Sequence, residues 1–217
     1  MIELDFTDLA PDTAPDQDEV KRAVAEADRL SVAGPVCALG AVLAALRRRD
    51  RLDVAVSWIP SGDPLASGLS RTWGVDAGGR LSGESSRTLR LVCDDRGGVL
   101  LARGRITAAQ PTQPAPTALR GGRAGSRFGA QIYHDDQRIA DGEIMRVDVR
   151  PDWSGVDTLR VNVHKQLWRR GEITHGRAVQ VACDAALIEI DGVPFARPMT
   201  KWTWYADSRL RWTLISI

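Results

Sequence analysis

The chain has 217 residues, of which 43% are hydrophobic and 26% are charged. These proportions are ordinary for a globular protein and exclude collagen, coiled coil and intrinsic disorder. The 29 Lys and Arg residues balance 28 Asp and Glu, so the net charge of +1 gives no overall attraction toward nucleic acid. The sequence has neither an apolar run long enough for a membrane span nor the layout of a signal peptide. We therefore expect a cytoplasmic protein.

The first 75 residues alternate between helical and strand patterns. Asp16 or Asp18 can cap a helix with an apolar stripe that includes Val20 and Val24. Pro35 suits the start of a second helix, which ends in arginines that complement the negative end of its dipole. The predicted elements are a strand at residues 1–6, a helix that includes 20–27, a strand at 30–32, a helix from 35 and a buried strand at 54–59.

After Gly74 the pattern changes to short alternating segments separated by turn signals such as Asp95–Gly98 and Asp191-Gly192. Such spacing is typical of an antiparallel sandwich. The predicted strands are 88–93, 98–105, 143–149, 158–164, 177–182, 187–190, 202–205 and 210–215. We therefore predict an α+β fold with two domains, a small α/β layer at residues 1–75 followed by a mainly antiparallel β-sandwich at 76–217.

Four segments carry a family resemblance. They are VAGPVC at residues 32–37, LDVAVSWIPSGDPLASGLSRTWGV at 52–75, RIADGEIMRVDV at 138–149 and VACDAALIEIDGVPF at 181–195. In this order they resemble the motifs of the diacylglycerol kinase and bacterial lipid kinase family, which is related to the NAD kinases. The resemblance implies an NAD kinase-like fold and a short helix after Pro60. With only 32 residues before Ala33, where the equivalent of the family's GGDGT loop begins, it also implies an N-terminally truncated nucleotide domain.

The two loops that would bind the nucleotide depart from the family pattern. Where the family has its GGDGT loop, this chain keeps Gly34 but has Pro35 in place of the acidic residue, which also removes an N–H donor. Where the family has a PxGTGN turn, Gly62 remains and Asp63 brings a carboxylate to the expected phosphate position. The resemblance assigns Gly34, Gly62 and Asp63 to cofactor binding, and these changes argue against ATP as that cofactor.

The third motif is also altered. Asp191-Gly192 remains, but Val193 stands where the family has the glutamate that accepts a proton from the lipid hydroxyl, and a valine cannot accept a proton. Asp191 is therefore the catalytic candidate that the resemblance leaves.

The resemblance also implies a structural magnesium ion on the second domain. Its ligands would be the Asp141 carboxylate and the backbone carbonyls of Arg138 and Glu143, and oxygen ligands suit this ion. The alternative interpretation is that Asp141-Gly142 is only a hairpin turn, where this dipeptide is common.

Other side chains allow a functional and a structural interpretation. Trp202 and Trp204 share one face of a predicted strand, and with Trp212 on the following strand they would form an apolar slot for a lipid or an aromatic cluster in the core. His134 is followed by two aspartates, but no further ligand stands at metal spacing, which favours a structural histidine.

The sequence therefore supports three hypotheses. The first is a non-catalytic or regulatory relative of the lipid kinases that binds a lipid, another small molecule or a protein partner, including a second copy of the chain. The second is an active ATP-dependent lipid kinase with divergent loops. The third is an unrelated α+β oligomeric binding protein, with the resemblance being accidental.

Overall fold

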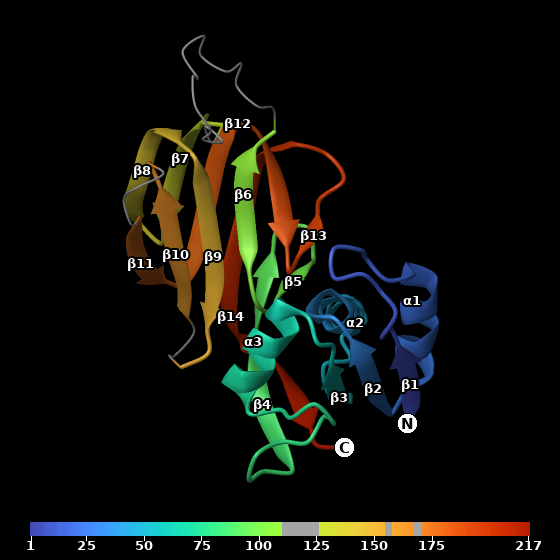
Figure 1. Cartoon of the computed structure of the whole chain (residues 1–217). Coiled ribbons are helices and arrows are strands. Elements are labelled where there is room, and N and C mark those ends of the chain that lie inside the picture. The colour runs from blue at the N-terminus through green and yellow to red at the C-terminus, as the bar shows by residue number, and fades with distance from the viewer. Residues whose placement is uncertain (110–125, 155–157, 167–170) are drawn as a thin grey trace.

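The structure, a computed structural model, describes residues 1–109, 126–154, 158–166 and 171–217 (Figure 1). These residues form three helices and one mixed sheet of 14 strands. The main strand order is β1-β2-β3-β14-β12-β6-β9-β10-β11, with β4, β5, β7, β8 and β13 paired off this path. No helix in this part of the chain is long and apolar enough to cross a membrane.

The N-terminal layer is parallel, because β1 pairs with β2 and β2 with β3 in the same direction. Asp16 caps the first helix, as expected, since its carboxylate accepts a hydrogen bond from the Asp18 N–H at 2.9 Å. The elements of this layer are β1 (Ile2–Asp5), α1 (Gln17–Glu26), β2 (Arg29–Gly34), α2 (Val36–Arg48), β3 (Ala55–Pro60) and α3 (Pro64–Trp73).

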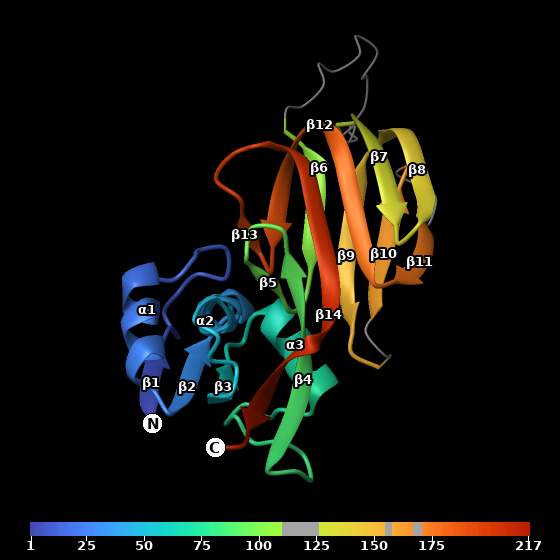
Figure 2. The ribbon, with the colours of Figure 1, turned by 180° about the vertical axis from the view of Figure 1, so that it is seen from behind.

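The remaining strands are antiparallel to one another and fold into the predicted sandwich (Figure 2). They are β4 (Ser86–Asp94), β5 (Val99–Leu100), β6 (Gly104–Ala108), β7 (Phe128–His134), β8 (Gln137–Ile144), β9 (Arg146–Asp152), β10 (Thr158–His164), β11 (Glu172–Gly176), β12 (Ala178–Ile190), β13 (Val193–Pro194) and β14 (Met199–Ile215). The α+β fold class is thus confirmed.

Several predicted strand limits were wrong. The segments at 177–182 and 187–190 are one strand, β12, and those at 202–205 and 210–215 are one strand, β14; irregular register within each strand hides the continuity in the sequence. The predicted strand at 98–105 is broken between β5 and β6. Asp141-Gly142 lies inside β8 rather than in a turn, and the β7–β8 hairpin turns at Asp135-Asp136 instead.

The tryptophans divide between two hydrophobic cores. Trp202 and Trp204 are buried in the sandwich core, whereas Trp212 is buried in the core of the α/β layer, where it meets Trp73 edge-on with ring centroids 5.7 Å apart. The structural interpretation is confirmed for Trp202 and Trp204. The three-tryptophan slot was wrong, because Trp212 lies on the same strand beyond a register shift and faces the other core.

The sheet continues across residue 75. The C-terminal end of β14 pairs in parallel with β3 at Leu214 and Val56, so the last strand of the chain joins the first layer. Strand β4 serves both cores, since Leu91 belongs to one and Val92 to the other. This continuity fixes the α/β layer beside the sandwich and sets the walls of the cleft between them.

Candidate functional site

A cleft of about 1130 Å³ separates α3 from the polar face of the sandwich sheet. Both views place α3 between α2 and the lower end of β9 (Figures 1 and 2). The side chains around the cleft come from the loop after β1, from α3, from the β5–β6 connection, from β9 to β11 and from the β12–β13 turn. They are Pro11, Asp12, Asp63, Pro64, Leu65, Gly68, Leu69, Thr72, Ala102, Arg103, Arg150, Pro151, Asp152, Trp153, Ser154, Arg160, His175 and Gly192.

Four of the predicted site residues lie on the elements that surround this cleft, and Asp63 is the one of them that lines it. Gly34 ends β2, and its carbonyl accepts a hydrogen bond from the Ser61 N–H at 3.1 Å, which brings the loop with Gly62 and Asp63 against it. The Asp191-Gly192 turn approaches from the sandwich, with Gly192 lining the cleft next to Leu65 of α3. The order of the motifs along the sequence therefore translates into a common location.

The Asp191 side chain is buried and fully engaged with the backbone. It is 2% exposed, and its carboxylate accepts hydrogen bonds from the N–H groups of Leu101 (2.8 Å), Ala102 (2.7 Å) and Arg103 (2.8 Å). Burial raises its pKa to about 6, against the opposing effect of these N–H donors and of the Arg103 guanidinium. These bonds explain why the predicted strand at 98–105 is interrupted. The N–H groups of Leu101, Ala102 and Arg103 donate to Asp191 and so are not available for pairing with a neighbouring strand.

The start of α2 is covered by the segment that follows β1. A side-chain carbon added to Gly34 would lie 2.7 Å from the Phe6 carbonyl oxygen, so the Phe6 backbone already occupies that face of the glycine. The Cys37 thiol, in the first turn of α2, donates to the Thr13 carbonyl at 3.4 Å. Similarly, the Pro11 carbonyl would be 2.7 Å from a carbon added to Gly192. The loop where the family would hold phosphates therefore faces protein rather than the open cleft.

Asp63 acts as the cap of α3. Its Oδ1 accepts from the N–H groups of Leu65 (2.8 Å) and Ala66 (3.0 Å), and its Oδ2 accepts from the Ser61 hydroxyl at 2.6 Å. Pro64 follows at the first helical position, and Gly74 ends the helix in the left-handed conformation. The carboxylate that interrupts the family motif thus stabilises a helix that forms one wall of the cleft.

The predicted magnesium ligands lie far from this cleft, on β8 near the opposite edge of the sandwich (Figure 1). Oδ2 of Asp141 is 2.8 Å from the Arg138 guanidinium, and both side chains are more than half exposed. A magnesium ion would have to compete with this guanidinium for the carboxylate. No cluster of three His, Cys, Asp or Glu side chains suited to a metal occurs among the described residues. The site built from Asp141, Arg138 and Glu143 stays a prediction.

The basic residues that line the cleft could not be recognised as a group from the sequence. Arg150 on β9 lies directly opposite Arg160 on β10, and Arg160 lies directly opposite His175 on β11. Nearby, Arg103 forms an ion pair with Glu189 at 2.9 Å. The strand alternation places these side chains on one face, but only the pairing register reveals that they form a row.

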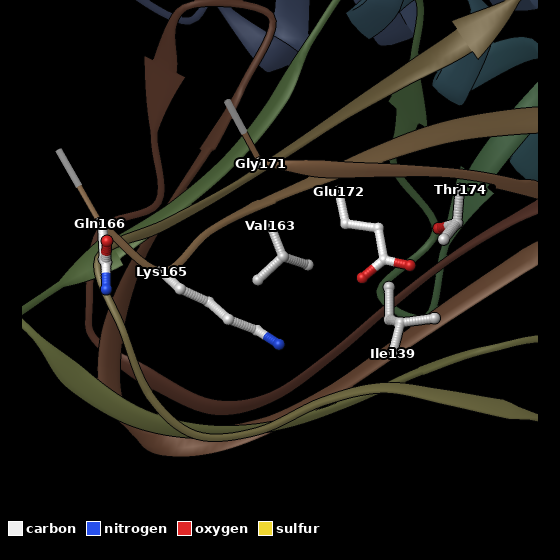
Figure 3. A pocket seen from close by; sticks show the side chains of 7 residues that line it. All are labelled: Ile139, Val163, Lys165, Gln166, Gly171, Glu172 and Thr174. Carbon is white, nitrogen blue, oxygen red and sulfur yellow. The ribbon is translucent and has the colours of Figure 1, made fainter. Parts of the chain in front are cut away.

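The other candidates have structural roles. His134 is buried, its Nδ1 is 2.6 Å from the Thr174 hydroxyl, and burial lowers its pKa, which confirms the structural interpretation. A second hollow, shown in Figure 3, contains Lys165 and Glu172 at the ends of β10 and β11. The part of this hollow that the described residues line has a volume of about 170 Å³. Ligand pockets usually have at least roughly 300 Å³.

Comparisons with known proteins identify the fold. No protein-family model matches the sequence, and no curated protein is similar to it. Among solved structures, a diacylglycerol kinase from Bacillus anthracis str. Sterne superposes with a TM-score of 0.63 and 14% identity, over 94% of this chain and 84% of that one. An NAD kinase from Archaeoglobus fulgidus in complex with ATP gives 0.52 and 10%, over 94% and 82%. Yeast NADH kinase complexed with NADH gives 0.51 and 9%, over 91% and 64%.

These likenesses confirm that the chain has the fold of diacylglycerol kinases and NAD kinases. The third hypothesis is therefore wrong in expecting an unrelated fold, and its expectation of oligomeric binding stays a prediction. At 9–15% identity the comparisons extend to the fold alone, and the activity has to be argued from the site.

Proposed function

We propose that this chain is a non-catalytic binding protein on the diacylglycerol kinase fold, and that its ligand occupies the cleft between α3 and the sandwich. The observation that carries the proposal is the covered start of α2. A phosphate-binding loop needs several backbone N–H groups free to approach the ligand, and here the segment from Phe6 to Thr13 packs onto Gly34 and the first turn of α2.

The state of Asp191 supports the same conclusion. A general base must reach the proton that it removes, within about 3 Å or through one water molecule. The Asp191 carboxylate instead points into the protein, where three backbone N–H groups occupy its oxygens. Val193, which follows in the same turn, offers no group that can accept a proton. The turn therefore serves to anchor the β5–β6 connection.

One assay distinguishes this proposal from the alternative of an active kinase with divergent loops. Purified protein would be incubated with radiolabelled ATP, magnesium and either diacylglycerol in mixed micelles or NAD, and product would be separated by chromatography. We expect no phosphorylated lipid or dinucleotide above the no-protein control. Steady product formation that disappears in Asp191→Asn, with that variant still folded by circular dichroism, would establish the kinase and overturn the proposal.

A further inference from the structure

Two arginines face each other across neighbouring strands on the sandwich wall of the cleft. Arg150 and Arg160 are direct partners in the β9–β10 pairing, so their side chains leave the same face of the sheet about 5 Å apart at Cβ. Like charges directly opposite each other destabilise a sheet. Among the described residues, neither guanidinium has a hydrogen bond or an ion pair, in contrast to Arg103 with Glu189.

The acidic side chains of the cleft are engaged elsewhere or lie apart from this pair. Asp63 caps α3, and Asp152 accepts hydrogen bonds from Ser154 and lies 3.6 Å from the His175 ring. Asp12 belongs to the loop that packs on the Asp191-Gly192 turn through the Pro11 carbonyl. The Arg150–Arg160 pair is therefore the position in the cleft where positive charge is least compensated.

The opposite wall is apolar. The face of α3 that lines the cleft carries Leu65, Gly68 and Leu69, which follow one another at helical spacing, and Trp153 continues this surface from the sandwich side. Trp153 is held in place because its indole N–H donates to the Leu101 carbonyl at 3.1 Å. Gly68 leaves open space in the middle of this wall, since a carbon added there would meet nothing within 4 Å.

We propose that the cleft binds an anionic amphiphile, with a phosphomonoester head held between Arg150 and Arg160 and a hydrocarbon chain lying along Leu65, Gly68 and Leu69. Guanidinium groups match phosphate oxygens with paired, charge-assisted hydrogen bonds, and one phosphomonoester has enough oxygens for both arginines. A cleft of about 1130 Å³ accommodates such a molecule. The inference rests on the proposed function for its location, and it names the ligand class of that site.

The test is calorimetric titration with three probes. Dodecyl phosphate, kept below its micelle-forming concentration, combines both features; inorganic phosphate has the head alone, and monolauroylglycerol has the chain alone. We expect saturable binding of dodecyl phosphate at least about tenfold tighter than either other probe. Equal binding of inorganic phosphate would show a plain anion site, and equal binding of monolauroylglycerol would show a plain apolar groove. Either result, or no binding of dodecyl phosphate, would overturn the proposal.

Two variants locate the binding. Arg150→Gln combined with Arg160→Gln should weaken dodecyl phosphate binding at least about tenfold, because both charge-assisted contacts are lost. The matched control is Arg29→Gln combined with Arg49→Gln, which changes net charge equally at exposed positions outside the cleft and should leave the affinity unchanged. Equal weakening in both pairs would mean that only overall charge matters, which would refute the site.

Gly68→Phe tests the helix wall independently. A Cβ at Gly68 meets nothing within 4 Å and the residue lines the open cleft, so we expect the ring to extend into the cleft, leaving the protein folded while dodecyl phosphate binding is lost. Unchanged binding in folded Gly68→Phe would refute the placement of the chain. The two proposals can fail separately. Because none of these titrations includes ATP, a failure to bind dodecyl phosphate would reject this ligand class without indicating kinase activity. Phosphoryl transfer in the kinase assay would instead overturn the proposed function.

Discussion

Replacing Asp191 with alanine should destabilise the protein by about 3 kcal/mol at pH 4.5, where the penalty for burying its charge is small, and by less at pH 7. The carboxylate accepts three backbone hydrogen bonds at 2.7–2.8 Å, and the substitution removes every acceptor while leaving the donors in place. A side chain retained only to abstract a proton would not be expected to contribute this much to folding. The variant therefore separates an architectural aspartate from a catalytic one.

The magnitude follows from the surroundings of each donor. Leu101 is fully buried, so its N–H would be left without a partner, at a cost of about 2 kcal/mol. Ala102 and Arg103 line the cleft, where water can reach their N–H groups, and each should cost about 0.5 kcal/mol. At pH 7, relief of the buried charge offsets about 2 kcal/mol of this total, so the measurement at pH 4.5 isolates the loss of the hydrogen bonds.

Urea unfolding followed by tryptophan fluorescence measures this difference directly. Asp191→Asn is the matched variant, because it keeps the shape and one acceptor oxygen, and it should cost less than Asp191→Ala. If Asp191→Ala unfolds within about 0.5 kcal/mol of the wild type at pH 4.5, the three hydrogen bonds do not hold the β5–β6 connection.

Four further outcomes are expected. Burial raises the pKa of Asp191 from 3.8 to about 6, so the folded state binds this proton more tightly than the unfolded chain does. The contribution of this group to stability is therefore greatest below pH 4, and it should fall by up to about 3 kcal/mol as the pH rises through 6. Between pH 4.5 and 7, urea titrations should show a fall about 2 kcal/mol larger in the wild type than in Asp191→Asn. Gly68→Ala should raise the unfolding free energy by about 1 kcal/mol in the same assay, because alanine favours a helix and meets no neighbour here. Trp73→Ala should lower it by about 3–5 kcal/mol, since Trp73 meets three other indole rings edge-on. If Asp141 binds magnesium, millimolar Mg²⁺ should raise the melting temperature of the wild type more than that of Asp141→Asn; equal melting curves with and without Mg²⁺ would count against that site.

Local chemistry made the α/β layer predictable from the sequence. The Asp16 cap, the apolar stripe of α1 and the proline before α2 are features that act within one or two turns of a helix. The alternation of β10 was equally clear, and its predicted limits agree with the structure. Errors arose in β12 and β14, where each long strand contains a register shift that breaks the alternation.

The site depended on contacts between distant parts of the sequence. Asp191 lies about ninety residues along the chain from the N–H groups that donate hydrogen bonds to it. No local sequence pattern could therefore show that it holds the β5–β6 connection. Arg150 and Arg160 face each other because of the register between β9 and β10, and the alternation within each strand does not determine that register. The family resemblance did locate Gly34, Asp63 and Asp191 in one region, but the cover formed by Phe6, Pro11 and Thr13 became visible only in three dimensions.

The covered start of α2 is tested most directly by calorimetric titration of the wild-type protein with ATP in the presence of magnesium. We expect no saturable heat up to millimolar nucleotide, because the segment after β1 packs on Gly34 and the first turn of α2. Saturable binding with a micromolar dissociation constant would contradict it, and would mean that this segment moves aside to expose a working nucleotide site.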